Sequence, residues 1–146
     1  MLENAMIACR DELWSDQKQN PQYWCLVYHT LFWLDFYLTE LPDDFIPPKP
    51  FTLSELDPEG LLPERIYTKS ELLKYLEHGR RKYKQTIENL TDEKANKPYM
   101  FGSVKMKFGE LLLYNLRHVQ HHSGQLNLIL RQKIDSAPRW VKRTNK

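Results

Sequence analysis

The proline-rich segment at residues 42–66 constrains the fold of this 146-residue chain more than any other feature. A proline removes a backbone donor and clashes with the preceding helical turn, so no continuous helix can cross the segment. Its flanks are each too short to form a separate domain. We therefore expect one domain over residues 1–146, in which a long crossover joins two helical halves. The prolines are Pro42, Pro47, Pro48, Pro50, Pro58 and Pro63.

Four stretches outside this segment have the apolar spacing of helices, and no stretch has a convincing strand pattern. The stretches are residues 2–15, which form a short helix, 21–41, 68–90 and 108–133. Residues 91–106 are expected to form a loop, because they contain a proline and a glycine. These features predict an all-α protein, a four-helix bundle with the crossover between its second and third helices.

Two details strengthen the helix assignments. Thr68 and Glu71 have the spacing of a capping box, which predicts a helix start at Thr68. The second helix has apolar residues on most of its circumference, so we expect it to be buried on most sides. The last helix has an apolar seam that should hold the fold by itself. This seam comprises Leu111, Leu112, Leu116, Leu126, Ile129 and Leu130.

The overall composition excludes several classes of protein. The net charge is only +2 and no basic stripe is visible, which argues against nucleic-acid binding. The locally basic runs, HGRRKYK at residues 78–84 and VKRTNK at residues 141–146, are expected to be a solvated helix face and a chain terminus. No run of 18 apolar residues is present, so we expect no membrane span. The two cysteines, Cys9 and Cys25, form no C-x-x-C pair, and no signal peptide opens the chain. These features favour a cytoplasmic protein.

The sequence HVQHH at residues 118–122 interrupts the apolar face of the last helix. His118 and His122 are four residues apart, so they share one side of the helix and can bind one ion. Asn115 and Gln125 lie on the same side. A buried polar group costs free energy unless it has a partner, and a metal ion would satisfy two imidazoles at once. Gln125 and Asn115 either hydrogen-bond near the metal or make helix–helix contacts.

A third ligand must come from another helix, and His29 is the only histidine on the second helix. A catalytic zinc typically has three protein ligands and one open position. His78 lies in a charged, solvated stretch, and His121 falls away from the apolar face. Spacing alone leaves two alternatives open: a chance H-x-x-x-H motif with His29 as a core residue, or a three-histidine site. Cys25, four residues before His29, could close the site as a fourth ligand.

No acidic residue shares the stripe with these histidines, so the sequence predicts no protein general base. A metal-bound water or thiolate would then supply the nucleophile. Two functions stay open on this basis. The first is a metal-dependent hydrolase or transferase acting on a small substrate. The second is a non-catalytic bundle, stapled by its metal, that binds a partner.

Two motifs resemble those of the DinB family. YHTLFWLDFYL at residues 28–38 is similar to the family's second-helix motif, which contains the first metal histidine. HVQHHSGQLNLILRQ at residues 118–132 is similar to its last-helix motif, in which two histidines four residues apart precede x-G-Q. The crossover and the capped third helix also fall where the family has them.

This resemblance implies a bundle of up-down-down-up order that binds a divalent metal through His29, His118 and His122. Ligand chemistry makes zinc the first choice of metal and nickel the second, because imidazole suits both. The family includes thiol-dependent S-transferases and a mycothiol-dependent isomerase, which implies a low-molecular-weight thiol as co-substrate, and its members often form homodimers. Ser123 departs from the family, since many members have Arg there.

Overall fold

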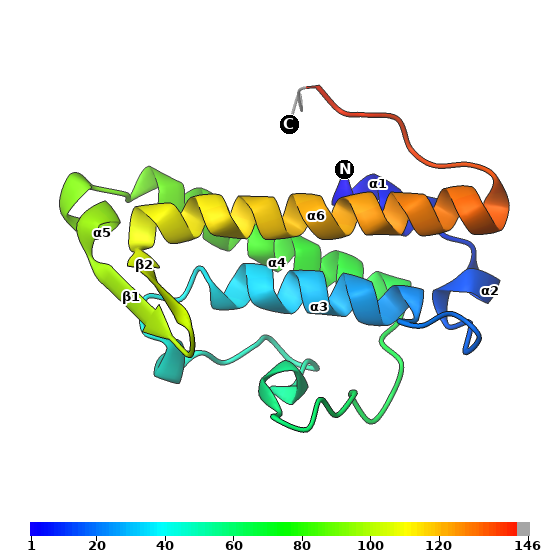
Figure 1. Ribbon diagram of the computed structural model, residues 1–146, viewed down its shortest axis with the longest axis horizontal. Coiled ribbons are helices and arrows are strands. Elements are labelled where there is room, and N and C mark those ends of the chain that lie inside the picture. Colours follow the sequence, from blue (N-terminus) through cyan, green and yellow to red (C-terminus); the bar gives the residue numbers. More distant parts are fainter. Residues whose placement is uncertain (143–146) are drawn as a thin grey trace.

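Two long antiparallel helices, α3 (Tyr23–Phe36) and α6 (Phe108–Ile134), lie side by side and form the centre of the fold (Figure 1). The computed structural model describes residues 1–142. The helix α4 (Lys69–Glu88) packs on α3 and runs in the same direction, and α1 (Leu2–Ala8) packs on α4 and α6. The remaining elements are α2 (Asp11–Trp14), the 3-10 helices η1 (Pro42–Asp44) and η2 (Ser54–Leu56), α5 (Asp92–Asn96), β1 (Pro98–Phe101) and β2 (Val104–Lys107).

Burial along α3 leaves two positions partly open to solvent. Every residue of this helix is buried except His29 and Trp33, which are half-buried. The expectation that this helix is covered on most sides is therefore confirmed. Because α4 and α6 both pack against α3, its apolar surface is removed from water on nearly all sides. The two half-buried side chains are four residues apart and so share the one remaining face.

The predicted start of α4 is confirmed. Thr68 accepts a hydrogen bond from the backbone N–H of Glu71, and the Glu71 carboxylate accepts one from the backbone N–H of Thr68. A cap of this kind stabilises a helix by about 1 kcal/mol. Arg65 adds a charge-assisted bond to the Glu71 carboxylate at 2.7 Å, which attaches the end of the crossover to α4.

The expected helical fold is confirmed in the main, but the protein is not purely α-helical, and the loop expected over residues 91–106 contains a short helix, α5, and two strands. Residues 98–107 form an antiparallel hairpin in which Phe101 pairs with Val104 across a two-residue turn. Gly102 has φ +54, a backbone conformation that glycine adopts without a Cβ penalty. The proline and glycine that suggested a loop instead mark the start of a strand and its turn.

Two expected helices differ in extent. The expected helix over residues 2–15 is broken, because Cys9 is extended and its carbonyl accepts a hydrogen bond from Lys69 Nζ at 2.6 Å. The expected helix over residues 21–41 ends at Phe36. Its final turn is closed from α4, since Lys82 Nζ donates to the carbonyl of Asp35 at 2.9 Å.

The predicted seam on α6 is right except at one position. Leu116 is 57% exposed, whereas the other five residues of the seam are buried. Its side chain borders an open hollow between α1, α4 and α6. The neighbouring Asn115 occupies the packed side of the helix in its place, where it is fully buried.

The crossover between α3 and α4 packs on these helices through aromatic side chains. Tyr28 donates a hydrogen bond to the carbonyl of Thr52 at 2.7 Å. The Phe51 ring stacks on Tyr75 of α4, with centroids 4.3 Å apart. These contacts place η2 beside the exposed face of α3. None of the helices in the described part of the chain has the length and apolar character needed to span a bilayer.

Candidate metal centre

The three histidines singled out from the sequence meet in the structure. His29 comes from α3, and His118 and His122 come from successive turns of α6. Each offers one ligand nitrogen, and these nitrogens all lie within 4.8 Å of one another. The Nε2 atoms of His29 and His118 are 3.3 Å apart. This is the separation at which imidazoles from two helices can share one small cation.

His29 is oriented by an acidic residue of the crossover. Its Nδ1 lies 2.6 Å from Oε2 of Glu55, in η2. The same oxygen accepts a hydrogen bond from Trp33 Nε1 at 3.1 Å. An ionised carboxylate can only accept, so we assign the proton to Nδ1 of His29. Its Nε2 then carries a lone pair directed at the other histidines.

His122 is oriented in the same way by Gln125. Its Nδ1 lies 2.6 Å from Oε1 of Gln125, one turn further along α6. With the amide oxygen as acceptor, Nδ1 carries the proton and Nε2 is free to bind. Gln125 thus contacts a histidine of the centre, as one of its two alternatives predicted. It is exposed, so it holds the ring from the solvent side.

The His118 ring is half-buried, like the other two. Burial, together with the neighbouring His122 and His29, lowers the pKa of His118 from 6.5 to about 3. Burial also lowers the pKa of His122. Both rings are therefore neutral near pH 7, which is the form that binds metals. Nδ1 of His118 is buried without a hydrogen-bond partner in the described part of the chain.

The orientation of the three rings is suited to binding a divalent ion. Two rings have Nδ1 occupied by an acceptor, and all three are placed to use Nε2. The Nε2 lone pairs of His29 and His118 face each other, which is unfavourable unless a proton or a cation lies between them. A neutral three-imidazole donor set suits zinc and other divalent transition metals. The three histidines are therefore compatible with a divalent transition-metal ion.

Asn115 lies outside the centre. Its Nδ2 donates to the carbonyl of Leu34 at 3.0 Å, which joins α6 to α3. Its Oδ1 is buried without a partner among the described residues. The structure therefore gives it the helix–helix contact, the second of the two roles left open.

Cys25 does not join the group of ligand atoms among the described residues. Its thiol is buried, and burial raises its pKa to about 11, so it is not a thiolate near neutral pH.

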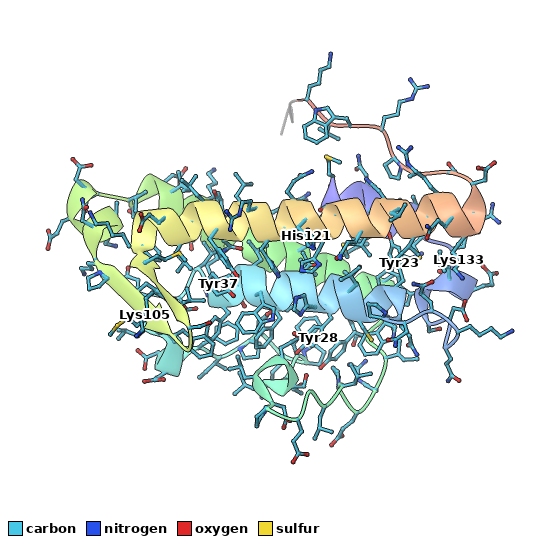
Figure 2. The ribbon with its side chains drawn as sticks, in the orientation of Figure 1. Tyr23, Tyr28, Tyr37, Lys105, His121 and Lys133 are labelled. Atoms are coloured by element: carbon cyan, nitrogen blue, oxygen red, sulfur yellow. The ribbon has the colours of Figure 1, made fainter. Side chains whose placement is uncertain are left out.

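The two remaining histidines lie elsewhere. His78 is not simply solvated: its Nε2 is 3.4 Å from the buried carboxylate of Asp35 on α3. His121 is exposed on α6, next to His122, with ring centroids 5.0 Å apart. Figure 2 labels it at the middle of α6, on the side of the molecule where α6 and α3 lie next to each other.

Glu55 is the residue that sequence reasoning missed. Helical spacing can indicate only an acid on the same stripe as the histidines, whereas Glu55 comes from the crossover. The surrounding prolines give no helical period, so no spacing rule relates residue 55 to residue 29. The only available signal was the length of the crossover itself, since long irregular segments are commonly functional.

Comparison with known proteins is consistent with this centre. The family model described as the DinB superfamily matches residues 10–126. Neither the curated proteins nor the solved structures gave a match. The matched range covers most of the chain and includes all three histidines and Glu55. The chain therefore belongs to the DinB superfamily.

Proposed function

We propose that this protein is a metal-dependent enzyme, of hydrolase or thiol S-transferase type, that acts on a small substrate. Its metal ligands are His29, His118 and His122. One observation carries the proposal: three imidazole nitrogens from two helices converge within 4.8 Å. The hydrogen bonds to Glu55 and Gln125 support it, because they hold two rings in the binding tautomer.

Zinc is the first choice of metal and nickel the second, since imidazole ligands suit both. When bound, the ion would act as a Lewis acid and lower the pKa of a water or low-molecular-weight thiol at its open position. The protein supplies the three neutral nitrogens and fixes their directions. Glu55 holds the Nδ1 proton of His29, which fixes the ring orientation and leaves Nε2 free to bind the ion.

The open position favours the enzyme over the metal-stapled interaction module. No fourth Cys, Asp or Glu joins the three histidines within residues 1–142. The His29 side chain is 36% exposed, so solvent reaches the centre. A structural zinc is normally enclosed by four protein ligands, whereas a catalytic one keeps an open site.

The remaining features of the proposal concern the whole chain. We propose one domain with the four-helix, up-down-down-up order of the family. The contacts of α3 with α4 and α6, and of α1 with α4 and α6, support it. A cytoplasmic location is supported by two free, buried cysteines. A homodimer is proposed from the family resemblance, and light scattering against the 17.6 kDa chain mass tests it.

The function is tested by metal analysis followed by activity screening. The purified chain should bind one zinc or nickel ion, and His118→Ala and His122→Ala should each abolish stoichiometric binding. His78→Ala and His121→Ala are the matched controls and should retain the metal. The loaded wild type is then screened for thiol conjugation and ester hydrolysis, with and without chelator. Stoichiometric metal in the His122→Ala variant would contradict the ligand assignment.

A further inference from the structure

A hollow of about 370 Å³ opens next to the metal centre along α6. It is lined by Tyr114, Arg117, His118 and His121. These residues have the spacing i, i+3, i+4 and i+7, so they form one stripe on the helix. His118 belongs to both the hollow and the centre. A molecule in the hollow therefore lies against a metal ligand.

Two larger hollows lack this connection. One of about 900 Å³ is lined by the crossover from Pro50 to Tyr67 and contains none of the three histidines. Another of about 520 Å³ lies between α1, α4, α6 and the chain beyond α6, again without a metal histidine. Size alone would favour them as substrate sites. Proximity to the chemistry favours the smaller hollow, whose volume still suits a small molecule.

The hollow beside His118 is positively charged. Arg117 is exposed and makes no ion pair with any carboxylate of residues 1–142. No acidic side chain lines the hollow, and His121 adds ring nitrogens that can donate. An unpaired guanidinium has a fork of donors that matches the oxygens of a carboxylate or phosphate.

The guanidinium is also held in place before a ligand arrives. It lies over the ring of Tyr114, with Cζ 5.5 Å from the centroid. Tyr114 in turn packs edge-on against Tyr37, the residue that follows α3, with ring centroids 5.4 Å apart. Because the arginine is already held against a packed tyrosine ring, it loses less side-chain entropy on binding an anion than a freely moving arginine would. The arrangement is therefore preorganised for a ligand with a negative group.

The charge of the metal-loaded centre also favours an anionic ligand. The three imidazoles are neutral when they bind an ion, and Glu55 is the one carboxylate within residues 1–142 that contacts them. A divalent ion therefore leaves a net positive charge in a partly buried site. Anionic ligands are attracted to such a site, and Arg117 adds a second positive group on one side of it.

We propose that the Tyr114–Arg117–His118–His121 hollow binds the oxyanion group of a small substrate or co-substrate while its reacting group lies at the metal. This deepens the proposed function, on which it rests, by naming the substrate class: a small organic oxyanion, such as a carboxylate. Arg117 is the anion-binding residue, and His121 is a second donor. The hollow thus sets specificity, and the three histidines set the chemistry.

The test compares two thiols on the full-length chain loaded with Co²⁺. The probes are 3-mercaptopropionate and its neutral amide, whose thiolates give a sulfur-to-cobalt absorption band. Arg117→Gln should weaken binding of the carboxylate by about 10-fold or more, the expected loss for a hydrogen bond between two charged groups. Its affinity for the amide should stay unchanged. Arg81→Gln, which removes an exposed arginine of α4, is the matched control and should change neither affinity.

The possible results distinguish the anion site from the metal centre. Equal carboxylate affinity in Arg117→Gln and Arg81→Gln overturns the anion site and leaves the metal centre intact. Equal loss for the acid and the amide shows damage to the centre and also overturns the anion site. Failure of the wild type to bind Co²⁺ overturns both this proposal and the proposed function. The Co²⁺ stoichiometry of each variant, measured first, separates these cases.

Discussion

Glu55 and His29 are 26 residues apart in the chain, yet the carboxylate Oε2 lies 2.6 Å from the imidazole Nδ1. The contact joins the proline-rich crossover to α3 at the candidate metal centre. It fixes the tautomer of His29 and adds negative charge behind the ring. The crossover is therefore part of the centre as well as a connection between helices.

Removing the Glu55 carboxylate should weaken metal binding without abolishing it. Glu55→Gln keeps an acceptor but loses the charge, and we expect about a 10-fold rise in Kd for Zn²⁺. Glu55→Ala also loses the acceptor and should have an effect several times larger. Competition with a chromophoric chelator measures both constants. Glu59→Gln, an exposed change in the same segment, is the control. Equal Kd values for all variants would show that the contact has no role in binding.

Trp33 should report metal binding by fluorescence. Its ring centroid lies 6.3 Å from that of His29, and its Nε1 donates to Glu55. Co²⁺ or Ni²⁺ at the centre should quench this residue because quenching by such ions is short-ranged. We expect stoichiometric quenching in wild type and loss of most of it in Trp33→Phe. Trp140→Phe, which removes a 66% exposed tryptophan, should retain the quenching. The reverse pattern would place the ion elsewhere.

The metal-free protein should lose stability as the pH falls below about 6.5. Burial lowers the pKa of His118 from 6.5 to about 3, and burial also lowers that of His122. Below about pH 6.5 the unfolded chain therefore binds protons that the folded chain does not bind, so protonation favours unfolding. Above that pH these two groups do not make the free energy of unfolding depend on pH.

Urea denaturation in the presence of chelator, between about pH 8 and pH 5, measures this dependence. In His118→Gln the urea midpoint should fall less between about pH 8 and pH 5 than in wild type. The variant lacks one of the two imidazoles whose pKa is lowered in the folded protein. His121→Gln should leave the fall unchanged. A midpoint independent of pH in wild type would contradict the neutral, buried state of His118 in the folded protein.

Substitutions of Asn115 and Gln125 should have different effects: the first should lower the free energy of unfolding, and the second should weaken metal binding. Asn115→Ala removes a buried hydrogen bond to the Leu34 carbonyl, so we expect a loss of about 1–3 kcal/mol in the free energy of unfolding. The affinity of the Asn115→Ala variant for metal should be the same as that of wild type. Gln125→Ala removes an exposed partner of His122, so it should weaken Zn²⁺ binding several-fold at little cost in stability. Thermal denaturation and chelator competition on both variants test the contrast.

The sequence predicted those parts of the molecule that depend on local spacing. His118 and His122 could be paired because four residues along a helix always share a face. The start of α4 could be placed because Thr68 and Glu71 meet within one turn. The buried character of α3 followed from apolar residues around most of its circumference. Each of these inferences needs only the helical period.

The parts that were missed depend on contacts between distant segments. Glu55 reaches His29 through an irregular crossover, which has no period from which a face could be assigned. The early end of α3 depends on Lys82 of α4, and the break after α1 depends on Lys69 of the same helix. Leu116 is open because Asn115 takes the packed side, although apolar spacing alone favours the leucine. Tertiary packing overrides local preference in each case.

Removing the metal should leave the helices in place. The junction of α3 with α4 does not use the centre: Asp35 is 1% exposed and accepts hydrogen bonds from Lys82 Nζ at 2.6 Å and Tyr75 Oη at 3.1 Å. The junction of α3 with α6 also includes Asn115 and the apolar side chains of both helices. These contacts persist without an ion, and burial of apolar surface is the dominant favourable term.

We therefore expect chelation to preserve the far-UV circular dichroism signal while it removes any transferase or hydrolase activity. Stability should fall only by the binding linkage, about 2.7 kcal/mol for free metal at 100 times Kd. Thermal melts at increasing Zn²⁺ concentration measure this increment, and His118→Ala, which lacks the site, should show none. A loss of helical signal on chelation would show instead that the ion staples the helices, and would favour the interaction module over the enzyme.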